Sequence, residues 1–207
     1  ITDLTLGQRT TRFQISGDDY CMPLIGRHNV ANAAAAVGLA RGIGISADEC
    51  AKALATAEPV PGRLEPIHCG QPFAVFVDYA HTDDALRQVL VTLREITPGR
   101  LHVIFGCGGN RDSGKRVKMG TVAAALADNS CITTDNPRHE NPELIAGQIA
   151  EGFASVSKSG WRVEPDRERA IDEILRAANP DDTVLIAGKG HETYQEIEGV
   201  VMPFDDR

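Results

Sequence analysis

The strongest constraint on the fold is a repeated pattern in residues 73–187, where short apolar runs alternate with segments of helical character. Each apolar run predicts a strand, and a polar or glycine-bearing loop follows it before the next helix. This alternation indicates an α/β fold of Rossmann-like type, with a mainly parallel sheet covered on both faces. The expected strands are 73–77, 101–105, 130–134, 161–163 and 183–187, and the expected helices are 83–96, 115–127, 141–153 and 167–178.

The N-terminal region has a different pattern. Residues 3–25 alternate weakly between apolar and polar side chains around turn residues, which predicts a β-hairpin or meander. An Ala-rich helix is expected over 27–41, with Asn29 as its N-cap, and Ser46 is expected to open a second helix through a capping box. Residues 58–62 are stiff and rich in turn formers, so we expect a domain boundary there. The two expected domains are residues 1–60 and 61–207.

Composition excludes several classes of function. The chain of 207 residues has a net charge of −8, which argues against general binding to nucleic acid or to an anionic membrane. No apolar run reaches ~18 residues and no signal peptide is recognisable, so we expect no membrane-spanning helix. The five cysteines are scattered and lack a CxxC pair, which is typical of reduced thiols in a cytoplasmic protein. Neither end looks like a natural terminus, so we expect a piece of a longer polypeptide.

The loop after the strand 101–105 carries a run of charged residues directly behind three glycines. Glycines at a strand end let backbone N–H groups approach a ligand closely, whereas a solvated charge run is the simpler interpretation. The segment also fits G-x-x-x-x-G-K, the start of a nucleotide P-loop, but Arg116 replaces the Ser or Thr that would bind Mg²⁺. We therefore predict a basic loop for a carboxylate or phosphate without metal. Its residues are Gly106, Gly108, Gly109, Arg111, Asp112, Lys115 and Arg116.

Two further strand ends carry residues suited to a charged small molecule, because ligands in open α/β sheets bind there. Asp-Asn-Pro is ordinary turn chemistry, but Arg138 lies between two Pro-bearing turns and is mounted for bidentate contact with a carboxylate. After the last strand, two glycines flank Lys189. Glu192 follows, and it could accept a ligand ammonium or be a solvated side chain.

Two other positions suggest a nucleotide. Asp78 ends the first strand and could accept from both hydroxyls of a ribose. Alternatively, Asp78 or Thr82 caps the next helix and His81 is a polar loop residue. Asn32, in the Ala-rich helix, could bind an adenine edge or lie on an exposed helix face. No cluster has metal-ligand spacing, and no G-x-S-x-G motif is present.

Together these segments resemble the Mur ligases, a family of ATP-dependent amide-forming enzymes of peptidoglycan synthesis. The resemblance runs in family order over nearly the whole chain. It is closest to the diaminopimelate-adding members, which DNPR distinguishes from lysine-adding ones. Asn110 and Asp83 depart from the Asp and Pro that are usual in the family. The segments are GRHNVANAAAA, PGRLE, VDYAHTDDAL, FGCGGNRDSGKR, TTDNPR and AGKGHETYQ.

The resemblance implies that residues 1–60 end the central ATP-binding domain and that 61–207 form the C-terminal domain, which binds the amino acid and contributes to the ATP site. It implies ATP-dependent addition of meso-2,6-diaminopimelate to the UDP-N-acetylmuramoyl dipeptide ending in D-Glu, through an acyl phosphate. The family's UDP-binding domain, P-loop and Mg²⁺ ligands have no counterpart in this sequence, so we expect the chain alone to be inactive. The implied diaminopimelate residues are Arg111, Asp135, Asn136, Arg138, Gly188 and Glu192, and the implied ATP residues are Asn32, Arg63, Asp78 and His81.

Two alternatives stay open at this stage. One is a lysine-adding or D-Ala-D-Ala-adding Mur ligase, against which DNPR speaks. The other is a non-catalytic module that binds amino acids or nucleotides and lacks a P-loop by design. An upstream in-frame GTxGKT segment in the gene would favour the ligase.

Overall fold

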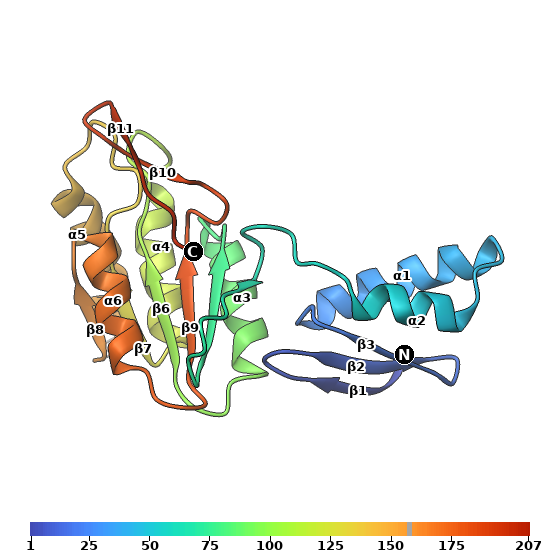
Figure 1. Cartoon of the computed structure of the whole chain (residues 1–207). Helices are drawn as coiled ribbons and strands as arrows, with labels where there is room; N and C mark the ends of the chain where they lie inside the picture. Colours follow the sequence, from blue (N-terminus) through green and yellow to red (C-terminus); the bar gives the residue numbers. More distant parts are fainter. Residues whose placement is uncertain (157–158) are drawn as a thin grey trace. The chain divides into compact units, whose positions relative to one another are not determined.

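The computed structural model describes residues 1–156 and 159–207, and the chain forms two compact units, Ile1–Val60 and Pro61–Arg207 (Figure 1). In the first unit, an antiparallel sheet in the order β1-β2-β3 packs against two helices. Its core includes Phe13, Tyr20 and Val37. The expected meander and helices are confirmed. The elements are β1 (Thr2–Leu6), β2 (Thr11–Ile15), β3 (Asp18–Met22), α1 (Arg27–Gly42) and α2 (Ala47–Ala55).

The helix starts of this unit test two capping predictions. The capping box of α2 is confirmed, because Ser46 Oγ accepts from the Glu49 N–H and the Glu49 carboxylate accepts from the Ser46 N–H. The prediction that Asn29 caps α1 is wrong. Gly26, with a φ of 89°, turns the chain into the helix earlier, and Asn29 lies in the first turn, donating to the Ile25 carbonyl.

The second unit is built on a mainly parallel sheet, which confirms the expected fold class. In the described part of the chain this sheet has six strands in the order β4-β5-β9-β6-β7-β8, of which only β4 is antiparallel to its neighbour. The short β4 was not predicted, since it contains a proline and pairs through two residues. The strands are β4 (Glu65–Pro66), β5 (Ala74–Asp78), β6 (Leu101–Phe105), β7 (Asn129–Ile132), β8 (Trp161–Val163) and β9 (Thr183–Ala187).

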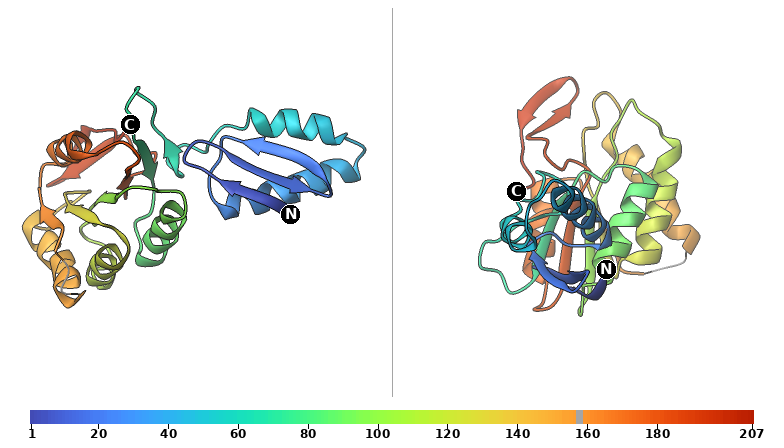
Figure 2. Two further views of the ribbon diagram at one scale, coloured as in Figure 1. Left: turned by 90° about the horizontal axis from the view of Figure 1, so that it is seen from below. Right: turned by 90° about the vertical axis from the view of Figure 1, so that its right-hand side faces the viewer.

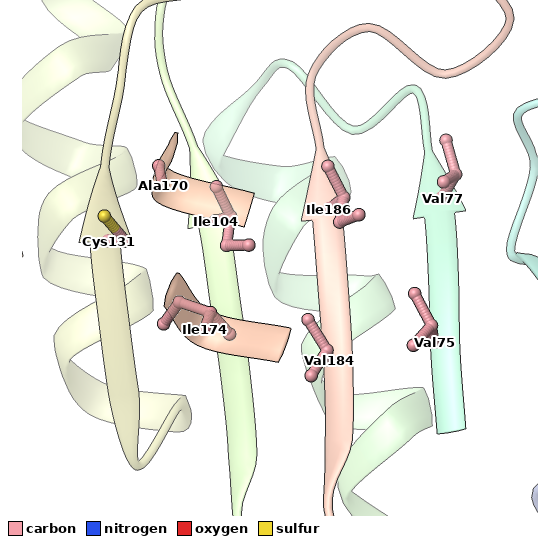
Figure 3. Packing of buried hydrophobic residues seen from close by; sticks show 8 residues of the cluster. All are labelled: Val75, Val77, Ile104, Cys131, Ala170, Ile174, Val184 and Ile186. Atoms are coloured by element: carbon pink, nitrogen blue, oxygen red, sulfur yellow. The ribbon is translucent and has the colours of Figure 1, made fainter. Parts of the chain in front are cut away.

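Helices cover both faces of this sheet (Figure 2). The helix α6 packs on one face over an apolar cluster, and Figure 3 shows its residues Ala170 and Ile174 beside side chains of the strands. The helices α3, α4 and α5 lie on the other face, as Figure 2 shows. The cluster comprises Val75, Val77, Ile104, Cys131, Ala170, Ile174, Val184 and Ile186. The helices are α3 (Asp83–Arg94), α4 (Gly114–Leu126), α5 (Pro142–Val156) and α6 (Arg167–Ala177).

A hairpin of β10 (Tyr194–Ile197) and β11 (Val200–Pro203), with its turn at Glu198-Gly199, follows the sheet. The residues after it pack onto the sheet domain. Arg167 donates from Nε and Nη2 to the Asp206 carboxylate, both at 2.7 Å, and both side chains are buried. The ion pair fixes this end of the chain beside the first turn of α6.

Candidate functional site

The loops that follow β6 and β7 pack backbone against backbone at the carboxyl edge of the sheet. A Cβ atom added to Gly106 would lie 2.2 Å from the Thr133 carbonyl oxygen, and one added to Gly109 would lie 1.9 Å from that of Pro137. The Gly109 N–H also donates to the Asn136 carbonyl at 2.9 Å. Two of the three glycines predicted to admit a ligand therefore admit the neighbouring loop instead.

Several backbone N–H groups of the P-loop look-alike after β6 are already paired within the protein. Those of Gly109, Asn110, Gly114 and Arg116 donate to protein acceptors. A P-loop points its backbone N–H groups at phosphates, so these four are not available for that role. Together with the mismatch at Arg116, this argues against a P-loop here.

Arg116 has a structural role, and its expected place among solvated or ligand-binding charges is wrong. Its side chain is 2% exposed and donates to the Glu140 carboxylate at 2.9 Å, to Gln148 at 2.8 Å and to the Gly108 carbonyl at 3.2 Å. Glu140 also accepts from the Asn110 N–H. The Arg116 hydrogen bonds hold the pKa of Glu140 below its ordinary value. This pair ties the loop after β6 to the loop after β7.

Arg138 is held on three sides. Its backbone has a φ of 53° and pairs with the β10–β11 hairpin, donating to the Glu196 carbonyl and accepting from the Glu198 N–H. Its Nη1 donates to the Gly109 carbonyl at 2.9 Å, and its Nε lies 3.3 Å from the Glu196 carboxylate. Within the described residues Nη2 has no protein acceptor. A ligand carboxylate would therefore find only Nη2 of Arg138 unpaired. The sequence analysis expected two guanidinium nitrogens to be available for bidentate contact.

Arg111 lies near Arg138 but is exposed. A Cβ atom added to Gly108 would lie 3.1 Å from Arg138 Nη1 and 3.9 Å from Arg111 Cγ, so both arginines border this glycine. Lys115, from the same loop, donates its Nζ to the His81 carbonyl at 2.6 Å. The structure thus brings Arg111 and Arg138 to opposite sides of one glycine.

Asp135, Asn136 and Glu192 form a second group beside Arg138. The Asn136 Nδ2 donates to Glu192 Oε2 at 2.9 Å, and Asp135 is buried. Gly188 has a φ of 115°, donates its N–H to the Asp78 carbonyl, and would place a Cβ 3.3 Å from Asp135 Oδ2. The position favours glycine because its backbone is left-handed and close to a carboxylate.

On the expected nucleotide side, the carboxylate of Asp78 is already engaged. It is 6% exposed and accepts from the Leu64 N–H at 2.7 Å and the Ala80 N–H at 2.8 Å. Thr82, not Asp78, caps α3, accepting from the Ala85 N–H. Asp78 therefore holds the segment around Arg63.

The remaining nucleotide-side residues gather on an aromatic ring. The Arg63 guanidinium carbon lies 4.8 Å from the Tyr79 ring centroid, and the His81 ring meets Tyr79 edge-on at 4.6 Å. The His191 ring lies 5.3 Å away on the same tyrosine. Asn32 lies in the other unit, on an exposed part of α1. The sequence analysis quoted Tyr79 and His191 within its motifs but assigned neither of them a role.

Cys107, after the end of β6, is not a candidate nucleophile. Burial raises the pKa of Cys107 to about 12, so this thiol at the strand end is protonated and unreactive at neutral pH. Among residues 1–156 and 159–207, no group of three or more His, Cys, Asp or Glu is arranged to hold a metal ion. None of the described helices combines the length and apolarity that crossing a membrane requires.

Comparison with known proteins gives consistent matches. The family model described as "Mur ligase, glutamate ligase domain" matches residues 62–190. The chain is 47% identical over 188 residues to the UDP-N-acetylmuramoyl-L-alanyl-D-glutamate–2,6-diaminopimelate ligase of Streptomyces avermitilis, covering 89% of this chain and 37% of that protein. It is 47% identical over 186 residues to the enzyme of the same name from Syntrophomonas wolfei, covering 90% and 38%. The chain therefore spans well under half of these relatives.

Solved structures agree. A structure with the same ligase name superposes with a TM-score of 0.80 at 38% identity, covering 100% of this chain and 43% of that one. Folylpolyglutamate synthase from Mycobacterium tuberculosis has a TM-score of 0.67 at 22% identity, which shows likeness of fold.

Proposed function

The chain belongs to the Mur ligase family, and on this premise we propose that it is the amino-acid-binding part of an ATP-dependent amide ligase. The complete enzyme would join meso-2,6-diaminopimelate to the D-Glu of UDP-N-acetylmuramoyl-L-alanyl-D-glutamate in cytoplasmic peptidoglycan synthesis. ATP would first phosphorylate the D-Glu γ-carboxylate, and the amine would then attack that acyl phosphate and expel phosphate. Residues 1–60 would belong to the central ATP-binding domain and 61–207 to the C-terminal domain.

The observation that supports this proposal best is the pairing of opposite charges around one strand edge. Arg138 offers Nη2, and Arg111 lies on the other side of Gly108. Glu192 keeps Oε1 without a protein donor among the described residues, while Oε2 accepts from Asn136. Diaminopimelate carries a carboxylate and an ammonium at each end, so one end would meet a guanidinium and a carboxylate together.

The contribution of these residues to the reaction would be positioning. They would hold the amino acid so that its free amine faces the acyl phosphate, which converts a bimolecular attack into an effectively unimolecular one. The group around Tyr79, with Arg63 and His81, would contribute to the ATP site, and Asp78 would support it through the Leu64 N–H. Family membership also implies Mg²⁺, but the described residues do not fit a metal cluster, so no step is assigned to it.

Calorimetric titration of the full-length protein with meso-diaminopimelate, lysine and D-Ala-D-Ala tests the proposal, using Arg138→Ala as the site control. We expect binding of diaminopimelate that the substitution weakens, and little binding of the other two ligands. Equal binding of lysine would favour a lysine-adding enzyme. If the protein binds ATP but none of the three amino-acid ligands, and releases no phosphate when the dipeptide is added, a non-catalytic module is favoured. The 207-residue chain alone should release no phosphate from ATP.

A further inference from the structure

Lys189 is a fully buried ammonium at the centre of the proposed amino-acid site. It lies between Gly188 and Gly190, and its side chain is 0% exposed. Burying an ammonium is unfavourable unless acceptors in the protein replace its water. Burial accordingly lowers the pKa of Lys189, against the opposing effect of Asp135. Such a group is retained only where its neighbours compensate for it.

The acceptors around Lys189 Nζ come from the loops that follow β7 and β9. Nζ donates to Asn136 Oδ1 at 3.0 Å and to Asp135 Oδ1 at 3.4 Å, and it lies 3.9 Å from Glu192 Oε2. The Tyr194 ring lies 5.7 Å away. Since Lys189 has no exposed surface, it acts on a ligand through these neighbours.

The hydrogen bonds of Asn136 show what Lys189 does. An amide offers acceptors only at oxygen and donors only at nitrogen. Asn136 Oδ1 accepts from Lys189 Nζ and from the Glu196 N–H, both at 3.0 Å. A flipped amide would set its NH₂ against an ammonium and an N–H group. The two donors therefore force Nδ2 toward Glu192 Oε2, 2.9 Å away.

We propose that Lys189 is a positioning residue of the amino-acid site. Its ammonium fixes the amide of Asn136, which in turn holds the Glu192 carboxylate in place to accept the ammonium of the incoming amino acid. This inference rests on the proposed function. It adds a residue that touches no ligand but sets the geometry of Asn136 and Glu192, which would touch it.

Steady-state kinetics of the full-length protein test this role through Lys189→Met, a chain of similar length without charge. One hydrogen bond to a charged group is worth roughly 1.5–3 kcal/mol, so the KM for diaminopimelate should rise about 10- to 100-fold. The KM for ATP should change less than about threefold. Lys118→Met, at an exposed lysine on α4, is the matched control and should leave both values unchanged.

A double variant separates positioning from general structural damage. If Lys189 acts through Asn136, adding Lys189→Met to Asn136→Ala should raise the KM for diaminopimelate by less than about threefold more. Independent effects would multiply instead, and that result would overturn the inference. A KM for diaminopimelate that Lys189→Met leaves unchanged would do the same.

Asn136→Asp keeps the test decisive if Lys189→Met fails to fold. The aspartate retains an acceptor for Lys189 but removes the donor toward Glu192. We expect a thermal midpoint at least as high as that of Asn136→Ala, with a KM for diaminopimelate raised about 10-fold or more. A wild-type KM in this variant would show that the amide orientation is irrelevant. If the wild-type protein itself does not use diaminopimelate, the proposed function fails, which is a distinct result.

Discussion

Arg111 and Arg138 occupy equivalent places on neighbouring loops, yet their surroundings differ. Both follow parallel strands that lie side by side, and both were expected to bind the same ligand. Arg138 is pinned by a backbone bridge, by the Gly109 carbonyl and by Glu196, whereas Arg111 projects from an exposed loop tip. The comparison teaches that a motif can identify a charged residue at a site without revealing whether its side chain is preorganised.

A third arginine sharpens the contrast. Arg116 follows Arg111 in the same charged run, but it is buried and joins the loop after β6 to Glu140 in the loop after β7. Its role is to connect the two loops. The loop after β7, which holds Arg138, is therefore positioned partly by Arg116 from the more exposed loop after β6. Substitutions in either loop can test how the two arginines differ.

The largest expected effect comes from removing the pinned arginine. In the full-length protein, Arg138→Ala should lower the ratio of kcat/KM for diaminopimelate to that for lysine by about 10- to 100-fold, because one charged hydrogen bond is worth roughly 1.5–3 kcal/mol. The loss should be smaller than the ~10⁴-fold expected for a fully unpaired polar group, since Glu196 remains beside Arg138 when lysine binds.

Arg138→Lys is the control for charge, and it should recover only part of the ratio because it cannot bridge Gly109 and Glu196 together. If the ratio stays constant while both rates fall equally, Arg138 only supports the loop. The carboxylate contact would then have to be sought at Arg111.

The next largest effect should come from the close approach of the two loops. Gly109→Ala would place a Cβ 1.9 Å from the Pro137 carbonyl oxygen, so the loops must separate. We expect a loss of about 1–3 kcal/mol in the free energy of unfolding, measured by urea denaturation, together with weaker diaminopimelate binding.

The matched control is Gly147→Ala in α5, where nothing lies within 4 Å of an added Cβ. It should stabilise the protein by up to about 1 kcal/mol, because alanine is the better helix former. Equal stability of the two variants would mean that the packing of Gly109 does not matter.

Much of the fold followed from local pattern, while the connections within the site did not. The alternation of strands and helices gave every long element of the second unit, because burial on both sheet faces demands apolar runs. The roles of Arg116, Lys189 and Glu196 depend on partners 24, 53 and 60 residues away in sequence. Local sequence patterns do not predict contacts between residues so far apart. From the sequence alone, these residues therefore look like solvated charges or turn residues.

Asn29 shows the same limit at short range. It is a good cap residue, but a left-handed Gly26 opens α1 instead. For α3 the sequence left Asp78 and Thr82 open as caps, and the structure has the Thr82 hydroxyl in that role. Which residue caps a helix depends on the position of the first helical residue. The preceding turn fixes that position, and the sequence pattern predicts such a turn less reliably than it predicts the helix itself.

A smaller effect should appear in the pH dependence of stability. The folded-state pKa of Glu140 lies below its ordinary value of 4.5, mainly because of the Arg116 hydrogen bond. The ionised carboxylate therefore contributes stability that is fully present above pH 4.5 and is lost as pH falls through the folded pKa. Wild type should be more stable than Glu140→Gln at neutral pH, and the difference should shrink only below pH 4.5.

Urea unfolding midpoints of the two proteins, compared at neutral pH and at steps below 4.5, measure this difference. Glu143→Gln is a suitable control, because Glu143 is exposed in the first turn of α5. A gap between wild type and Glu140→Gln that is independent of pH would show that charge at Glu140 does not hold the loops together.

The smallest effect should come from the exposed arginine, and it bears most directly on the comparison. Arg111→Ala should change the free energy of unfolding by less than about 0.5 kcal/mol, because the side chain is exposed and packs against little. Its KM for diaminopimelate should rise about 3- to 10-fold, less than for Arg138→Ala, since an unpinned side chain loses rotamer entropy when it binds. Arg111→Lys should recover most of this loss, because an exposed side chain that contributes mainly its positive charge does not depend on the planar guanidinium group. If Arg111→Ala instead matches Arg138→Ala in KM and leaves stability untouched, Arg111 is ordered by the ligand and both arginines hold it equally.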